Sequence, residues 1–325
     1  MPINISNDFL SLARFLFVDG HLIVYAKIKN EKGFMPSFKS VCLRWEIRLL
    51  RPLFDRISIN AIRVLQDKLG VIGAKSSKTA FKCFSINGFD ACFADPAGMQ
   101  SGRVILYLHG GAYISGNIKY ALGFASKLAA ETNQRVLCAA YRLAPENPFP
   151  AAVEDALAAY EYLLDNGYDP GGISLAGESA GGGLAFSLCL KLKEKGLPLP
   201  RAIVGISPWV DLTMSGSSYK TNGAKDPVLS EKGLRRAAEF YAAGRREDPL
   251  ASPLFGDLSG FPPSLIFAGG DELLLDDAKE LARRLEGMGG RCELVIEEGL
   301  WHAYALFKLP EAEKALRKIS GFLWQ

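Results

Sequence analysis

A short turn with the sequence Gly-Glu-Ser-Ala-Gly, at residues 177–181, constrains this chain more than any other segment. It follows the apolar run 173–176 and precedes a helix-like stretch, 182–195. A serine in such a turn takes a strained backbone conformation, and bulky side chains two residues before and after it would collide. The pattern therefore predicts a strand, a sharp turn that presents the Ser179 hydroxyl beyond the sheet, and a helix.

The rest of the chain repeats this strand and helix alternation. Candidate strands are 103–108, 135–140, 173–176, 201–206, 264–269 and 292–297, and candidate helices are 119–131, 151–166, 182–195, 231–243, 276–287 and 310–323. A hairpin is expected around Asn87-Gly88, between 81–86 and 91–94. Alternation of this kind predicts an α/β fold, with a mostly parallel sheet and helices on both faces.

Two segments depart from the alternation. Residues 1–72 show mainly helical spacing of apolar side chains, and Phe9, Leu12, Phe15 and Leu16 suggest one helix face. This face is expected to pack on the protein body, with contact to a lipid interface as the alternative. The second segment is a long loop-rich excursion after 201–206. We therefore expect a helical segment at 1–75 and an α/β domain at 76–325, with a lid or pocket wall at about 208–260.

Composition excludes several classes of protein. Of the 325 residues, 49% are hydrophobic and 22% are charged, and the net charge of +3 argues against a nucleic-acid partner. No uncharged stretch approaches the ~20 residues of a membrane span. No phosphate loop or zinc-spaced Cys/His cluster is present, so neither a cofactor nor a metal is expected. A disulfide between Cys83 and Cys92 stays open, but the missing secretory signal favours free thiols and a cytoplasmic location.

A serine nucleophile needs a general base, and the chain has three histidines from which to choose. His21 lies in the N-terminal segment, and His109 opens a glycine pair where another role is expected. His302 follows the last candidate strand, 292–297. Histidine titrates near neutral pH, so we expect His302 to be the base, with activity rising through about pH 6–7.

The base in turn needs a carboxylate to orient it. Asp271 follows the strand 264–269 after one glycine, Gly270. This is the carboxyl edge of the sheet, where open α/β sheets place functional groups. We expect Asp271 to be this acid, with Glu272 and Asp276 as alternatives. The order Ser179, Asp271, His302 is that of the α/β hydrolases.

The oxyanion of an acyl-transfer intermediate needs backbone N–H donors held in place beforehand. His109-Gly-Gly-Ala directly follows the strand 103–108, and Ala180 opens the helix after the serine. Gly110, Gly111, Ala112 and Ala180 are therefore the candidate donors. The spacing leaves open which of the loop amides serve, and His109 is expected to brace the loop.

Together these blocks resemble the hormone-sensitive-lipase-like family of α/β hydrolases. The resemblance spans about residues 100–325. Its blocks are His109–Tyr113, Tyr141–Pro150, Gly177–Gly182, Ser207–Asp211, Asp248–Pro253, Gly270–Asp277 and His302–Tyr304. It implies an eight-stranded α/β-hydrolase fold with a helical cap, and hydrolysis of small-molecule carboxylic esters with short to medium acyl chains through an acyl-enzyme. Tyr113, Glu178 and Trp209 are expected at the substrate pocket, with burial under the lid as the alternative for Trp209.

Other functions remain compatible with these motifs. The same residues could hydrolyse amides, N-acetyl groups or lactones. Receptors on this scaffold bind ligands without catalysis, but they lack the histidine that this chain has at 302. The strand 292–297 is expected at or near a sheet edge, where it could pair with a second copy, so both a monomer and a homodimer stay open.

Overall fold

The structure is a computed structural model. It describes residues 13–18, 21–26, 36–54, 58–64, 78–99 and 102–325. The chain divides into two compact units, Met1–Pro36 and Ser37–Gln325.

The first unit contains an antiparallel hairpin of β1 (Ala13–Val18) and β2 (His21–Ala26), in which Val18 pairs with His21. The helix expected around Phe15 and Leu16 is therefore wrong over the described residues, and Phe9 and Leu12 lie outside them. Both strands are dense in aromatic and β-branched residues, and Asp19-Gly20 between them is a two-residue hairpin sequence. That local signal outweighs the helical spacing of a few apolar residues.

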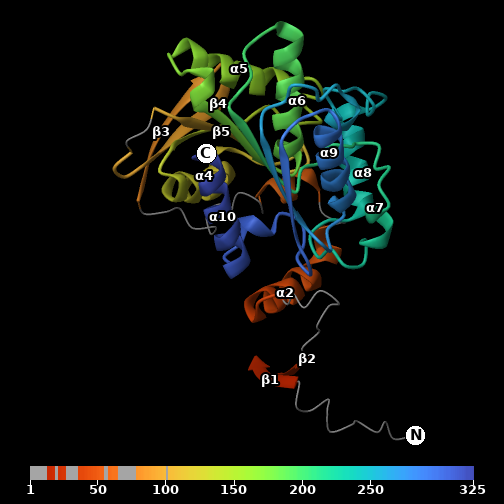
Figure 1. The fold of residues 1–325 in the computed structure, drawn as a ribbon. Coiled ribbons are helices and arrows are strands. Elements are labelled where there is room, and N and C mark those ends of the chain that lie inside the picture. The colour runs from red at the N-terminus through yellow and green to blue at the C-terminus, as the bar shows by residue number, and fades with distance from the viewer. Residues whose placement is uncertain (1–12, 19–20, 27–35, 55–57, 65–77, 100–101) are drawn as a thin grey trace, which may run out of the picture. The chain divides into compact units, whose positions relative to one another are not determined.

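The second unit is built on an eight-stranded sheet, which Figure 1 shows with its flanking helices. The strands are β3 (Thr79–Ile86), β4 (Phe89–Pro96), β5 (Val104–Leu108), β6 (Arg135–Ala139), β7 (Ile173–Glu178), β8 (Ala202–Ile206), β9 (Ser264–Gly269) and β10 (Cys292–Glu297). Their order is β10-β9-β8-β7-β5-β6-β4-β3, and the first six strands in this order are parallel. The predicted mostly parallel sheet is confirmed, and β10 lies at its edge.

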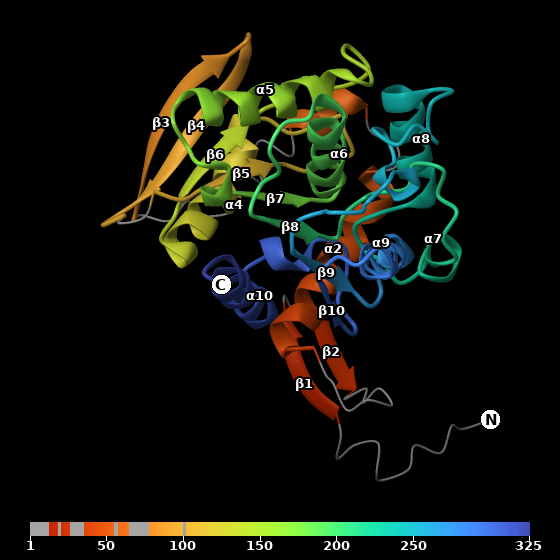
Figure 2. The same cartoon turned by 45° about the horizontal axis from the view of Figure 1, so that its top comes forward.

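Helices cover both faces of this sheet (Figure 2). The helices α5 (Ala151–Asp165), α6 (Ala180–Lys195), α8 (Glu231–Ala242) and α9 (Leu275–Gly287) pack in one core, and α4 (Ile118–Thr132) and α10 (Pro310–Leu323) pack in the other. Along β5, Leu106 points into the first core and Tyr107 into the second, as the two-residue period of a strand requires. The sheet therefore separates two apolar layers.

Further helices lie before the sheet and within its connections. The helix α2 (Phe38–Phe54) precedes the sheet, and the excursion between β8 and β9 holds α7 (Ser218–Thr221), α8 and the short helix η2 (Pro253–Phe255). The short helix η1 (Pro170–Gly172) directly precedes β7, and the short helix η3 (Tyr304–Leu306) follows β10. Among the described residues, no helix has the length and apolar character needed to cross a bilayer.

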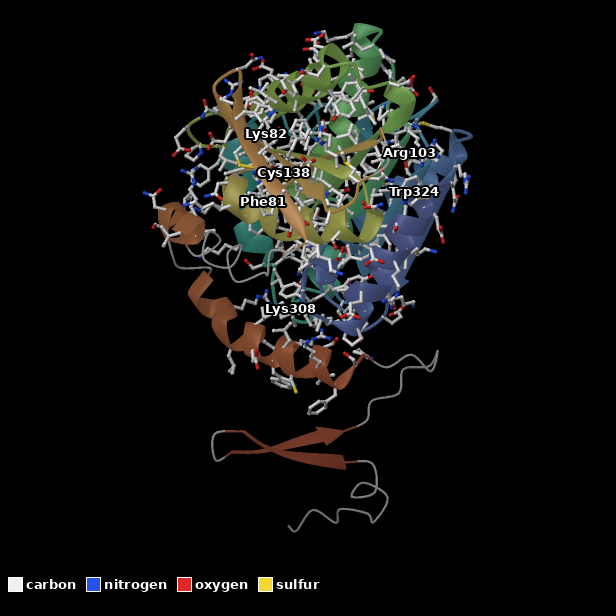
Figure 3. The ribbon with its side chains drawn as sticks, turned by 90° about the vertical axis from the view of Figure 1, so that its left-hand side faces the viewer. Phe81, Lys82, Arg103, Cys138, Lys308 and Trp324 are labelled. Atoms are coloured by element: carbon white, nitrogen blue, oxygen red, sulfur yellow. A yellow bond between two sulfur atoms is a disulfide. The ribbon has the colours of Figure 1, made fainter. Side chains whose placement is uncertain are left out.

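A disulfide joins the two outer strands, because Cys83 and Cys92 face each other directly across β3 and β4. The favoured expectation of free thiols is therefore wrong for this pair. Cys92 is also in register with Cys138 of β6, which Figure 3 labels. Residues directly opposite each other on neighbouring strands have closely spaced Cβ atoms, and this spacing brings the sulfur atoms of Cys83 and Cys92 together.

The last helix is fastened to the start of the central strand β5. Arg103, labelled in Figure 3, donates to the main-chain oxygen of Leu323 at 3.0 Å, and its guanidinium lies 4.8 Å from the ring centroid of Trp324. This cation–π contact holds the end of α10 against the sheet.

Candidate active site

Ser179 lies in a sharp turn between β7 and α6. Its φ of 55° and ψ of −122° fall in a region that side-chain-bearing residues rarely adopt. A Cβ on Gly177 would lie 2.3 Å from the main-chain oxygen of Gly181, and one on Gly181 would lie 2.0 Å from that of Leu108. Both glycines are therefore required by close backbone approach. The Ser179 amide donates to Ile206 O at 2.9 Å, so the neighbouring strand β8 holds the turn.

His302 lies in the loop that follows β10, and its side chain is buried. Its Nδ1 lies 4.0 Å from Glu272 Oε2 and has no hydrogen-bond partner among the residues that the structure describes. Burial lowers the pKa of His302 to about 3. The imidazole is therefore neutral at neutral pH, which is the form that accepts a proton.

The structure brings Glu272, and not Asp271, to His302. Glu272 is fully buried in the turn after β9, and burial raises the pKa of its carboxyl to about 8. Asp271 instead forms an ion pair with Arg44 of α2, at 2.8 Å between Oδ2 and Nη1. Asp276, the other alternative, accepts hydrogen bonds from Ser217 and Ser218 near the start of α9.

Ser207 holds the acid turn and the histidine loop together. Its hydroxyl donates to Glu272 Oε2 at 2.6 Å and accepts the Ala303 amide at 3.0 Å. Ser207 directly follows β8, has a φ of 49° and is fully buried. The family block Ser207–Asp211 marks this position in the sequence, but nothing in its residue types indicates a contact with Glu272.

The loop after β5 has three consecutive residues with positive φ, namely Gly111, Ala112 and Tyr113. A Cβ on Gly111 would lie 2.1 Å from Ser115 O, so this position requires glycine. The Gly110 amide donates to Glu178 Oε1 at 2.5 Å and is therefore occupied. In the part of the chain that the structure describes, the Gly111 and Ala112 amides donate to no other atom.

Ala180, the first residue of α6, adds a third amide, because the first N–H groups of a helix have no intrahelical acceptor. Gly111, Ala112 and Ala180 are thus the amides left available to an oxyanion. The helix N-terminus also favours negative charge at this point.

Glu178 supports the glycine loop from below. Its fully buried carboxyl accepts the Gly110 amide and the Tyr107 hydroxyl, and burial raises its pKa to about 7. The structure therefore places this candidate pocket residue beneath the loop.

His109 braces the same loop. Its Nδ1 lies 2.7 Å from Gly110 O, and its ring stacks on Tyr141 at 4.3 Å between centroids. Tyr141 also donates from its hydroxyl to His109 O at 2.6 Å. Burial lowers the pKa of His109 to about 4, which keeps the ring neutral. Tyr141 opens the segment Tyr141–Pro150, to which the sequence assigned no chemistry, and its contact here is with the loop.

Known proteins with this fold identify the family of the chain. A family model described as the alpha/beta hydrolase fold matches residues 105–306. This chain belongs to the α/β-hydrolase family.

Its relatives include named esterases. An acetyl-hydrolase of Streptomyces hygroscopicus is 45% identical to this hydrolase over 230 residues, which are 69% of this chain and 76% of that protein. An esterase of Acinetobacter venetianus is 34% identical over 224 residues, covering 68% and 74% of the two chains. A crystal structure of an esterase from the bacterial hormone-sensitive lipase family has a TM-score of 0.85 and 37% identity, and covers 89% of this chain and 98% of that one. These likenesses confirm the predicted hormone-sensitive-lipase-like family and support a carboxylic ester hydrolase.

The other two pocket candidates of this hydrolase lie in an aromatic cluster. Tyr113 stacks on Tyr241 of α8 at 3.8 Å between ring centroids, and the ring centroids of Trp209 and Tyr113 lie 6.2 Å apart. All three side chains are buried. The cluster joins the glycine loop to the excursion between β8 and β9, in line with the alternative of burial for Trp209.

Proposed function

We propose that this α/β hydrolase is a cofactor-free serine carboxylesterase that cleaves short- to medium-chain esters through an acyl-enzyme. The observation that carries the proposal is the strained Ser179, which begins a helix beside a loop with available amides. Ser179 is the proposed nucleophile, His302 the base and Glu272 the acid. The named esterases and the acetyl-hydrolase among the relatives support a carboxylic ester substrate.

In the first step, Ser179 Oγ attacks the ester carbonyl while His302 accepts the hydroxyl proton. The amides of Gly111, Ala112 and Ala180 donate to the oxyanion that forms. Such donors stabilise the transition state because they are oriented before the charge develops. Collapse of the tetrahedral intermediate breaks the bond to the leaving alkoxide, and His302 returns the proton to it as the alcohol departs.

In the second step, water attacks the acyl-enzyme. His302 accepts a proton from the water, the oxyanion forms in the same donors, and Ser179 leaves with the proton that His302 returns. Glu272 lies on the Nδ1 side of the ring, where its ionised form stabilises the imidazolium in both steps. Because burial raises the pKa of this carboxyl to about 8, turnover requires a pH at which Glu272 has lost its proton. We therefore propose Glu272 in the role that the sequence predicted for Asp271.

The direct test is active-site labelling with a fluorophosphonate probe, followed by mass spectrometry of the labelled peptide. We expect one label per chain at Ser179 and its loss in His302→Ala, because an unactivated serine does not react. Folded protein that takes up no label would contradict the proposal and favour a ligand-binding protein. A panel of p-nitrophenyl acetate, butyrate and octanoate, with an anilide and a lactone, then defines the acyl chain and tests the amide and lactone alternatives.

A further inference from the structure

The side of the helix α2 that faces the rest of its unit carries both arginines and apolar side chains. Phe38, Trp45 and Leu49 lie on one stripe of the helix and are 42%, 58% and 76% exposed. Arg44 and Arg51, one heptad apart on the opposite side, reach loops that lie more than 170 residues further along the chain. Directional hydrogen bonds therefore specify where this helix sits, with Leu43 and Ile47 packing beside them.

Arg44 contacts three separate loops at once. Its Nη1 lies 2.8 Å from Asp271 Oδ2 and donates to Gly299 O at 3.0 Å, and its Nη2 donates to Lys225 O at 2.7 Å. Only a guanidinium has a rigid fork of donors that can serve a carboxylate and two carbonyls together. The ion pair is largely sequestered, with side-chain exposures of 20% for Arg44 and 22% for Asp271.

These contacts flank the proposed acid and base. Asp271 directly precedes Glu272, and Gly299 lies three residues before His302. The Asp271 amide also donates to Leu300 O at 2.9 Å, which ties the two loops to each other. A displacement of Asp271 would therefore move both members of the buried pair.

The residue on the other side of Glu272 depends on the same helix. The Leu273 amide donates to Asp226 Oδ2 at 3.0 Å, and Arg51 donates to the main-chain oxygen of Asp226 at 2.9 Å. Glu272 thus lies between two residues that α2 holds, one directly through Arg44 and one through Asp226.

We propose that Arg44 is a positioning residue for the reaction, and that its ion pair with Asp271 sets the geometry of Glu272 toward His302. The proposal rests on the proposed function, because it assigns the acid role to Glu272. It gives the N-terminal helix a direct effect on the rate of turnover.

The test measures steady-state kinetics on p-nitrophenyl butyrate, a small soluble ester. We expect Arg44→Gln to lower kcat by about 10- to 100-fold with KM changed by less than about twofold, because a displaced acid affects the transition state more than binding. Asp271→Asn should have the same effect, and the double variant should be no slower than either single one. Arg48→Gln is the matched control, since Arg48 is exposed on the same helix and contacts Trp45.

Two results would overturn the proposal. One is a folded Arg44→Gln variant with the wild-type kcat. The other is an Asp271→Asn variant as slow as Glu272→Gln, which would identify Asp271 as the acid. If Arg44→Gln does not fold, Asp271→Asn removes the same ion pair from the other side and decides alone. Ser179→Ala separates the two hypotheses: full activity in that variant refutes the serine mechanism, whatever Arg44→Gln does.

Discussion

The two halves of the candidate site are built by different means. Around Ser179, main-chain atoms pack directly against main-chain atoms, and Gly177 and Gly181 are present because any Cβ there would collide with the neighbouring backbone. On the side of His302, side chains hold side chains, with Ser207 bonded to Glu272 and Arg44 paired with Asp271. A glycine-rich motif specifies a backbone conformation. An acidic turn contains several carboxylates, and the packing around the turn determines which of them reaches the histidine.

The largest expected effect tests the backbone-built half. Ser179→Ala should lower kcat by about 10⁴–10⁶-fold, because members of a nucleophile–base–acid set act as a unit. Turnover of p-nitrophenyl butyrate with a circular dichroism check of folding measures it. Residual activity near that of the unchanged protein would remove Ser179 from the mechanism.

The next effect tests the side-chain-built half at its least obvious residue. Glu272→Gln should lower kcat by on the order of 10³–10⁴-fold, because the imidazolium loses its compensating charge. Asp271→Asn is the matched control, since it changes the adjacent carboxylate in the same way and should cost about 10- to 100-fold. Reversal of this order would assign the acid role to Asp271.

Gly181→Ala should lower the stability of the fold around the Ser179 turn. The new Cβ would lie 2.0 Å from Leu108 O and 2.4 Å from His109 O, neither of which can move without the sheet. We expect a loss of about 3 kcal/mol or more in the free energy of unfolding, measured in urea. Gly321→Ala in α10, where a Cβ would have no atom of a described residue within 4 Å, should instead stabilise the fold by about 0.5–1 kcal/mol. Equal effects of the two changes would contradict the role of close backbone approach.

Ser207→Ala should weaken the link between acid and base without removing either. Glu272 loses a hydroxyl donor and the Ala303 amide loses its acceptor, so we expect kcat to fall about tenfold, at a stability cost of about 1–3 kcal/mol. Ser187→Ala is the control, because it removes a buried hydroxyl for which the described part of the chain provides no hydrogen-bond partner. If both variants keep the wild-type kcat, the Ser207 bridge has no kinetic role.

The smallest expected effect is a displacement of the pH profile. Burial lowers the pKa of His302, and the neutral imidazole is the active form, so the base stays competent to lower pH than a free histidine. Turnover also needs the Glu272 carboxylate, and burial raises the pKa of that group to about 8, so the acid limb of kcat/KM should follow Glu272 and lie above the unperturbed histidine value of about 6.5. A limb below about pH 6 would show that the ionisation of Glu272 does not limit turnover.

The lowered pKa of His302 also makes the free energy of unfolding depend on pH. A buried neutral histidine contributes stability that is fully present above the unfolded-state pKa of about 6.5 and is lost as the pH falls toward the folded value. Unfolding measured by circular dichroism across the same pH range separates acid loss of structure from loss of the base.

Much of the fold could be predicted because it depends on short-range pattern. Apolar runs of strand length and helical segments alternate from β5 onward, and the ends predicted for β9 and β10 coincide with those observed. The N-terminal hairpin was missed because the apolar residues of 13–18 fit a helical period as well as a strand. The Cys83–Cys92 disulfide was disfavoured because localisation was inferred from the sequence, whereas the strand register decides which sulfur atoms meet.

The sequence by itself determined the family, the α/β architecture, the strained Ser179 turn and the glycine loop, because close backbone approach restricts these positions to particular residue types. Only the tertiary structure decided which carboxylate faces His302, which loop amides stay available and what Arg44 holds. Asp271 and Glu272 are chemically alike neighbours in one turn, and their side chains leave it toward different surroundings. One meets Arg44 from a helix more than 200 residues earlier in the chain, and the other enters the buried space beside Ser207 and His302.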